Sequence, residues 1–186
     1  VASPHFNFSL PEPTGVVAAL CPPSYGLIGI VSVMAPLIAG GNTCVLIASY
    51  EKPLSAITFG EVLHVSDLPA GVVNIITGFG SDIGEPLVTH RDVAKIGFTG
   101  GDKTGEAVYG LAAKGIKKVT LELGGKSPHL VFDDANLELA ATTVVRGIVQ
   151  NTGQTCTAGS RLLVQQSIHD RFLALVADKF KQVRVG

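Results

Sequence analysis

One cysteine of this chain lies among residues that suit chemistry better than packing. Cys156 is part of "GQTCTAG" (153–159), in which small and polar residues flank the thiol. Cys21 and Cys44 lie instead among Leu, Ala, Val and Ile, where a thiol acts as a small hydrophobic side chain. A thiol in a polar setting of this kind is not explained by packing. The local pattern therefore sets Cys156 apart from the other two thiols and leaves its role open.

A carboxylate is the second candidate for chemistry. In "LELGGK" (121–126), Glu122 stands between two leucines at the end of a predicted buried strand. A carboxylate in that position is costly unless it is paired or works as an acid or base. The alternative interpretation is a surface glutamate at a strand end, followed by a simple turn at Gly124 and Gly125.

A glycine-bearing stretch, "FTGGDKTGEA" (98–107), is the third candidate. A phosphate-binding P-loop needs Lys and then Ser or Thr after its second glycine, but Glu106 and Ala107 follow Gly105, and the GxGxxG fingerprint is also absent. What remains is a strand-to-helix turn with backbone N–H groups at a helix N-terminus. Such a turn is either a phosphate cradle or only a tight connection. The five histidines are scattered, so no metal site is expected.

The elements that position these candidates are predicted from short apolar runs, which alternate along the chain with helical patterns. Alternation of this kind indicates βαβ crossovers, hence an α/β fold with a parallel sheet and helices on both faces. Ligands of such sheets bind beyond the carboxyl ends of the strands. Strands are expected at 14–20, 42–49, 71–78, 93–100 and 117–124, and helices at 26–40, from Pro53 onward, and at 103–113.

The pattern changes after Gly125, where we place a domain boundary. A strand, a turn and a helix are expected over 127–156, with Asp133, Asp134 and Asn136 suited to a helix start. Another strand is expected at 160–166, followed by an amphipathic helix over 167–183. Asn151 and Gln154 are expected to shape the loop that precedes Cys156.

Composition excludes several classes of partner. A net charge of −1 with no basic run argues against nucleic acid. Three widely spaced cysteines do not form a disulfide framework, which favours a reducing, cytoplasmic compartment. Prolines and glycines interrupt the uncharged stretch 13–50, and its longest uninterrupted apolar piece falls short of the roughly 20 residues that a membrane-spanning helix needs. Because the chain begins without Met or a leader pattern, we expect a mature or cut segment.

Taken together, "FTG…G", "VTLELGGKSPHLVFDDANL" and "GQTCTAGSRLLVQ" resemble the aldehyde dehydrogenase superfamily, and "EPTGVV", "PLSA" and "GVVNIITG" match it as well. The resemblance implies a Rossmann-like dinucleotide-binding domain over 1–125 and the incomplete beginning of an α/β catalytic domain over 126–186. It also implies oxidation of a small aldehyde to a carboxylic acid with NAD or NADP as cofactor, in a parent protein that is a homo-oligomer.

The same resemblance implies a role for each candidate. The Cys156 thiolate would attack the aldehyde to give a thiohemiacetal, which passes hydride to NAD(P)⁺ and leaves a thioester for water to hydrolyse. Glu122 matches the family's base, which serves the thiol and also activates the hydrolytic water, and the Cys156 N–H and Ser24 would bind the oxyanion. Cofactor contacts would come from Ser49, Phe98, Thr99, Gly100, Gly101, Gly105, Leu123 and Gly124.

The chain also departs from the family. "PPSYG" (22–26) stands where the family has "PWNFP", so Ser24 replaces the oxyanion Asn. "IASY" (47–50) stands where the family has "KPSE", so Ile47 replaces the ribose-binding Lys, and Tyr50 replaces the acidic residue. Gly101 replaces a turn serine. These changes favour the alternative function, an inactive or truncated aldehyde-dehydrogenase-like domain with a structural or assembly role. Because family members are far longer, we expect negligible activity from the 186 residues alone.

Overall fold

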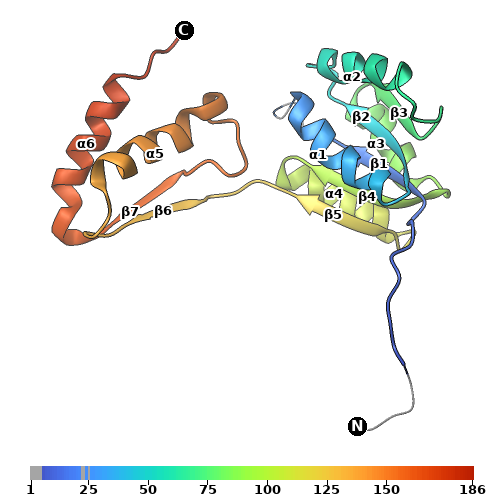
Figure 1. Ribbon diagram of the computed structural model, residues 1–186, viewed down its shortest axis with the longest axis horizontal. Helices are drawn as coiled ribbons and strands as arrows, with labels where there is room; N and C mark the ends of the chain where they lie inside the picture. The colour runs from blue at the N-terminus through green and yellow to red at the C-terminus, as the bar shows by residue number, and fades with distance from the viewer. Residues whose placement is uncertain (1–5, 22–23, 25) are drawn as a thin grey trace. The chain divides into compact units, whose positions relative to one another are not determined.

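The computed structural model describes residues 6–21, 24 and 26–186, which divide into two compact units. Unit 1 ends at Glu122, and unit 2 spans Leu123–Gly186. Figure 1 shows the elements of each unit in chain order. Among the helices of these described residues, none is long and apolar enough to cross a membrane.

Unit 1 is built on a five-stranded sheet in the order β3-β2-β1-β4-β5, and every neighbouring pair is parallel. The chain therefore moves outward from β1 to β3, returns to the other side of β1, and continues to β5. This reversal between β1 and β4 is the place where open α/β sheets bind ligands. The strands are β1 (Val16–Leu20), β2 (Thr43–Ala48), β3 (Val73–Thr77), β4 (Val93–Thr99) and β5 (Lys118–Glu122).

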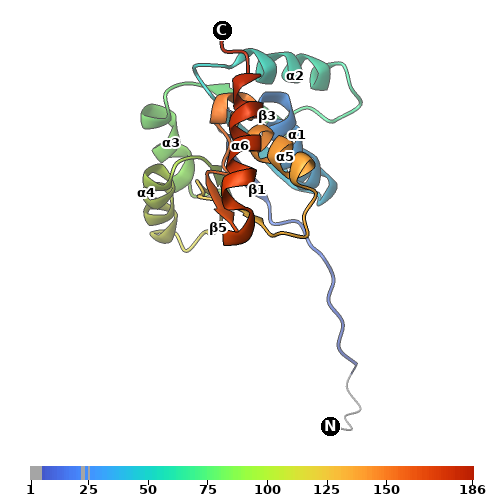
Figure 2. The same cartoon turned by 90° about the vertical axis from the view of Figure 1, so that its left-hand side faces the viewer.

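Helices cover both faces of this sheet, as the sequence predicts. Figure 2 shows α1 and α2 on one side and α3 and α4 on the other. Their bounds are α1 (Gly26–Ala39), α2 (Leu54–His64), α3 (Gly80–Thr89) and α4 (Asp102–Ala113). Met34, Cys44 and Leu46 are completely buried in the core between α1, α2 and the strands. Each large apolar side chain buried in this way contributes about 1.5–3 kcal/mol of transfer free energy.

Helix α3 is the one element of unit 1 that the sequence analysis did not predict. Gly80, Gly84 and Pro86 lie inside it, and no side chain caps its N-terminus at Phe79. Local propensity therefore disfavours a helix here. The segment must nevertheless cross from β3 to the far side of β1, and parallel strands in one sheet are joined by a right-handed crossover that is usually helical.

Strand β5 is exposed on one face, contrary to the predicted buried strand. Lys118, Thr120 and Glu122 are exposed, whereas Val119 and Leu121 are half-buried. β5 is an edge strand, since it pairs only with β4 in the sheet order. The other predicted strands of unit 1 are confirmed, with small differences at their ends.

Unit 2 pairs a small parallel sheet with two helices. β6 (Pro128–Val131) and β7 (Arg161–Val164) pair in parallel, and α5 (Leu137–Val149) and α6 (His169–Lys181) lie side by side in Figures 1 and 2. The core of this unit is centred on Phe172, which is fully buried. Asn136 caps α5 as predicted, because its Oδ1 accepts a hydrogen bond from the Leu139 N–H at 3.1 Å.

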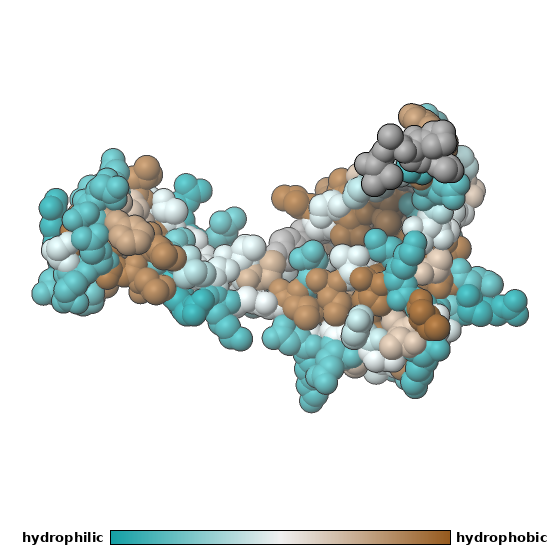
Figure 3. All heavy atoms as spheres, turned by 90° about the horizontal axis from the view of Figure 1, so that it is seen from below, coloured by the Kyte–Doolittle hydropathy of each residue, from teal (hydrophilic) through white to brown (hydrophobic). Residues whose placement is uncertain are grey.

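Hydrophobic side chains are also exposed on the surface of unit 1. Figure 3 shows hydrophobic atoms interspersed with hydrophilic ones on the visible face. Isolated exposed hydrophobic residues are ordinary in globular proteins. The exposed large residues of α1 are Leu27, Ile28 and Val31.

Candidate active site

A cavity of about 550 Å³ lies at the carboxyl ends of the strands of unit 1. It is bounded by the ends of β1, β2 and β4 and by helices α3 and α4. This is the position at which ligands of open α/β sheets bind, and the volume falls in the range of small-molecule sites. We call it the strand-end cavity. Five predicted cofactor residues line it: Ser49, Phe98, Thr99, Gly100 and Gly101.

The turn between β4 and α4 is closely packed. The Gly100 N–H donates to the Glu122 carbonyl at 3.0 Å, which ties the turn to the end of β5. A Cβ at position 100 would lie 2.6 Å from Cζ of Phe98, so only glycine fits without a shift. Gly105 is buried inside α4 and donates to the Gly101 carbonyl at 3.0 Å. It supports the turn, but it is not one of the lining residues of the strand-end cavity.

The segment after β2 forms another wall of this cavity. Ser49, Tyr50 and Glu51 line it, and Ile47 is buried at the end of the strand. The Tyr50 ring packs against Phe79, with ring centroids 4.4 Å apart. Sequence reasoning missed Glu51 and Phe79, because neither falls on a position of the family's motifs.

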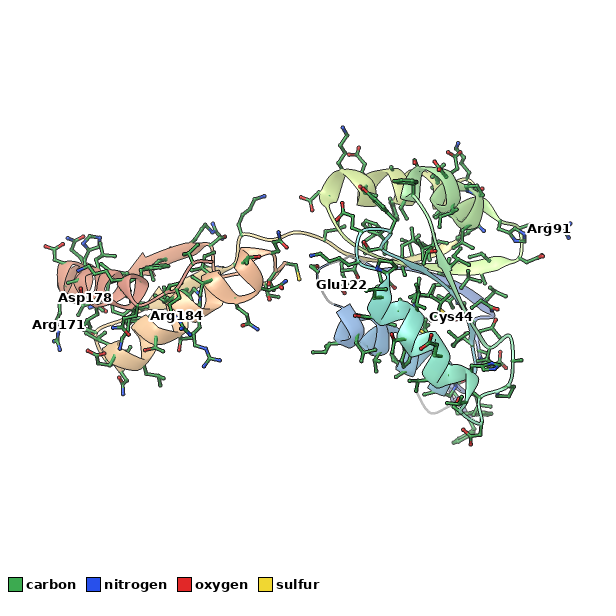
Figure 4. All side chains as sticks on the ribbon, turned by 90° about the horizontal axis from the view of Figure 1, so that it is seen from above. Cys44, Arg91, Glu122, Arg171, Asp178 and Arg184 are labelled. Carbon is green, nitrogen blue, oxygen red and sulfur yellow. The ribbon has the colours of Figure 1, made fainter. Side chains whose placement is uncertain are left out.

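Glu122 and Ser24 lie in unit 1, outside the lining of the strand-end cavity. Glu122 ends β5, as Figure 4 shows, and it is exposed rather than buried. It lines a second cavity of about 370 Å³ between α1 and strands β1, β4 and β5, together with Lys95 and Thr120. Ser24 is half-buried in the turn before α1, whereas its neighbours Pro22, Pro23 and Tyr25 lie outside the described residues.

Cys156 lies in a constrained loop of unit 2, between the 3₁₀ turn η1 (Gln150–Gly153) and β7. Asn151 and Thr152 have positive φ angles of 52° and 56°, in the region that non-glycine residues seldom adopt. The Asn151 side chain donates to the Gln154 carbonyl at 3.0 Å, so it shapes the loop as expected. The loop is therefore held in one backbone conformation at some cost in strain.

Glycines allow the Cys156 loop to pack closely against the rest of unit 2. A Cβ at Gly125 would lie 2.6 Å from the Cys156 carbonyl oxygen. A Cβ at Gly159 would lie 1.7 Å from Nε2 of His129. That Nε2 atom is buried and has no hydrogen-bond partner among the described residues. The His129 ring therefore contacts Gly159 by van der Waals packing. The sequence analysis gave Gly125 only the role of a turn and did not predict this packing.

Leu123, Gly124 and Cys156 belong to unit 2, whereas Glu122 is the last residue of unit 1. The role of Glu122 as the base for chemistry at Cys156 therefore stays a prediction, and so do the cofactor contacts of Leu123 and Gly124. Among the residues that the structure describes, no group of three His, Cys, Asp or Glu side chains is placed to hold a metal ion.

The three thiols are expected to differ strongly in reactivity. Burial raises the pKa of Cys21 to about 11, and burial together with the nearby Cys21 raises the pKa of Cys44 to about 12. At pH 8 their thiolate fractions are roughly 10⁻³ and 10⁻⁴, and the thiolate is the reactive form. Cys156 is half-buried in a polar loop. We expect iodoacetamide to label Cys156 first, and labelling of Cys21 to accelerate about tenfold per pH unit up to pH 11.

Peptide mass mapping after brief labelling at pH 8 checks this expectation. The Cys156→Ser variant serves as the control and should lose the fast adduct. First labelling at Cys21 or Cys44 at this pH would contradict the assignment of Cys156 as the reactive thiol.

Comparison with known proteins decides the family. A model of the aldehyde dehydrogenase family matches residues 2–186. The chain belongs to the aldehyde dehydrogenase family. A hydroxyisobutyraldehyde dehydrogenase of Mycolicibacterium austroafricanum is 44% identical over 180 residues, which are 97% of this chain and 36% of that protein. The chain thus spans about a third of the length of the relatives it matches.

Solved aldehyde dehydrogenases share the backbone of this family member. An NADP-dependent enzyme of E. coli is 36% identical with a TM-score of 0.91, and the match covers 94% of this chain and 36% of that one. A betaine aldehyde dehydrogenase of Staphylococcus aureus, solved in complex with NAD⁺, is 39% identical with a TM-score of 0.90, over 94% of this chain and 35% of that one. These structures bear out the expected α/β fold; the first is NADP dependent and the second contains NAD⁺.

Proposed function

We propose that this chain supplies the cofactor-binding domain and the nucleophile of an NAD(P)⁺-dependent aldehyde dehydrogenase. Unit 1 is the dinucleotide-binding domain, and unit 2 is the beginning of the catalytic domain. The observation that carries this proposal is the strand-end cavity, which has the size and the place in the sheet of a nucleotide site and is lined by five residues predicted from sequence to contact the cofactor.

The residues around the cavity fit a dinucleotide. Helices α3 and α4 begin beside it, at Gly80 and Asp102, and in the described part of the chain neither N-cap residue, Phe79 nor Gly101, makes a side-chain capping hydrogen bond. Backbone N–H groups and the positive end of the helix dipole suit a pyrophosphate. Gly100 and Gly101 let the backbone approach it, and Ser49 offers a hydroxyl to a ribose. When bound, NAD(P)⁺ supplies the acceptor for a hydride.

The residues of the chain would then carry out the covalent steps. The Cys156 thiolate adds to the carbonyl carbon of the aldehyde, and the Cys156 N–H and the Ser24 hydroxyl donate to the resulting oxyanion. Loss of hydride from this thiohemiacetal leaves a thioester on Cys156. Glu122 takes a proton from a water molecule, which attacks the thioester and releases the carboxylic acid and the thiolate.

A structural or assembly role is the alternative function. Ser24 and Ile47 favour it, because they replace an oxyanion donor and a cationic ribose contact of the family. Loss of one oxyanion donor lowers kcat by about 10²–10³ in a well-studied hydrolase, so the replacement weakens catalysis without abolishing it. A constrained loop around Cys156 favours the enzyme.

Titration calorimetry with NAD⁺ and NADP⁺ tests the proposal on the 186-residue chain, which should bind at least one of them. Position 101 offers a matched pair of variants, since a Cβ there meets nothing within 4 Å. Gly101→Asp places a carboxylate beside the pyrophosphate, whereas Gly101→Asn keeps the shape without the charge, and both residues are good helix N-caps. We expect Gly101→Asp to bind about tenfold more weakly than Gly101→Asn.

An absorbance assay for NAD(P)H with a panel of small aldehydes gives the second readout. Turnover is expected from a longer protein that carries this chain, and negligible turnover from the 186 residues alone. Absence of binding to both dinucleotides at millimolar concentration would favour the structural role instead.

A further inference from the structure

The charges around the strand-end cavity are of one sign. Glu51 and Glu85 line it, and none of its described lining residues is Lys, Arg or His. Similar solved structures include an NADP-dependent enzyme and an NAD⁺ complex, with TM-scores of 0.91 and 0.90. The backbone therefore does not distinguish the two cofactors. They differ by the 2′-phosphate on the adenosine ribose, and a phosphate monoester carries about −1.5 to −2 charges at pH 7.

Contacts within the segment after β2 hold Glu51 in place. The Tyr50 hydroxyl donates to Glu51 Oε1 at 3.3 Å, and the Glu51 N–H donates to Ser49 Oγ at 3.3 Å. The Tyr50 ring is itself supported by Phe79. A carboxylate thus lies next to the serine hydroxyl at the end of β2, although position 47 carries Ile47 and no cation.

We propose that this chain selects NAD⁺ over NADP⁺, with Glu51 accepting hydrogen bonds from the 2′- and 3′-hydroxyls of the adenosine ribose. This inference rests on the proposed function, because it assigns a specificity to the same cavity. A ribose diol offers two O–H donors, and a carboxylate accepts them as charge-assisted hydrogen bonds. A 2′-phosphate offers no such donor and would be repelled by Glu51 and Glu85, because like charges at short range raise the free energy.

Neighbouring cations do not offset this repulsion. Lys52 follows Glu51 in the sequence and Lys103 lies in the first turn of α4, but neither is a lining residue of the cavity. Tyr50 is a positioning residue, because it acts on the ribose only through Glu51.

Titration calorimetry at low ionic strength, with NAD⁺ and NADP⁺ as separate ligands, tests the inference on the 186-residue chain. We expect NAD⁺ to bind at least about tenfold more tightly than NADP⁺. Glu51→Gln should reduce this ratio by about three- to tenfold, and Glu51→Lys should bring it to unity or invert it. Tyr50→Phe keeps the ring on Phe79 but removes the hydroxyl, so it should weaken NAD⁺ binding by about two- to threefold.

Glu106→Gln is the matched control, because it removes the same charge from an exposed position of α4 that does not line the cavity. It should leave the ratio unchanged. Equal or tighter binding of NADP⁺ by the native chain would overturn the inference and leave the proposed function standing. A ratio that Glu51→Gln leaves unaltered would overturn the role of Glu51. Binding of neither dinucleotide would overturn the inference and the proposed function together.

Discussion

Replacing Cys156 with alanine is expected to abolish aldehyde oxidation by a longer protein that carries this chain. The proposed reaction passes through a covalent bond between Sγ of Cys156 and the carbonyl carbon, and alanine has no atom to form that bond. Loss of a catalytic nucleophile lowers kcat by about 10⁶ in a well-studied hydrolase, so we expect a decrease on the order of 10⁴-fold or more. NAD(P)H absorbance at saturating aldehyde measures the loss.

The matched control is Cys44→Ala, which removes a thiol from the core of unit 1. Cys44 is fully buried and belongs to the cluster between the sheet and helices α1 and α2 (Figure 4). This variant should lose some stability and keep its turnover. Glu122→Gln tests thioester hydrolysis, because it removes the base that activates the water, whereas the thiolate fraction of Cys156 can still attack the aldehyde. We expect this variant to release about one equivalent of NAD(P)H and then to stop, because the thioester accumulates on the enzyme.

These variants also separate the two candidate functions. A Cys156→Ala protein that keeps more than a tenth of the native turnover would overturn the role of Cys156 as the nucleophile. Absence of turnover in the unsubstituted longer protein would instead fit the structural role that Ser24 and Ile47 favour. Nucleotide binding by unit 1 should be the same in all variants at Cys156, since the described lining residues of the strand-end cavity all belong to unit 1.

The sheet was predictable because its strands carry their signal locally. "TGVVAAL" and "NTCVLIAS" are short apolar runs between turn residues, and they form β1 and β2. α3 was not predictable in this way, because Gly84 and Pro86 oppose a helix and the crossover topology imposes one. The exposed face of β5 was also missed, because a run of apolar residues does not reveal whether a strand lies at the edge of a sheet.

The candidate site was predictable where it depends on motifs and not where it depends on contacts between distant segments. The turn at Gly100 and Gly101 follows from glycines between a strand and a helix; it lines the cavity, and its contact with a cofactor stays a prediction. The contact between Tyr50 and Phe79 joins residues that follow two different strands, so no local sequence pattern predicts it. Gly125 is another case of this kind, because only the folded unit brings it against Cys156.

Gly125→Ala is accordingly expected to impair the proposed reaction, although it adds only one methyl group. The new Cβ would lie 2.6 Å from the Cys156 carbonyl oxygen, whereas even the closest ordinary carbon–oxygen contacts are about 3.3–3.6 Å. The backbone at Cys156 must therefore move by roughly 1 Å, and a misplacement of this size can lower catalysis about 10²-fold. The same crowding should lower the free energy of unfolding of unit 2 by about 1–3 kcal/mol.

Three measurements distinguish displacement of the nucleophile from general loss of structure in this variant. Turnover in the longer protein and the rate of Cys156 labelling should both change, while dinucleotide binding by unit 1 stays as in the native chain. Gly110→Ala is the control, because a Cβ there meets nothing within 4 Å and alanine favours a helix interior by about 0.5–1 kcal/mol over glycine. Native turnover in Gly125→Ala would mean that the loop accommodates the methyl group at little cost, and that the backbone position of Cys156 does not set the reactivity of its thiol.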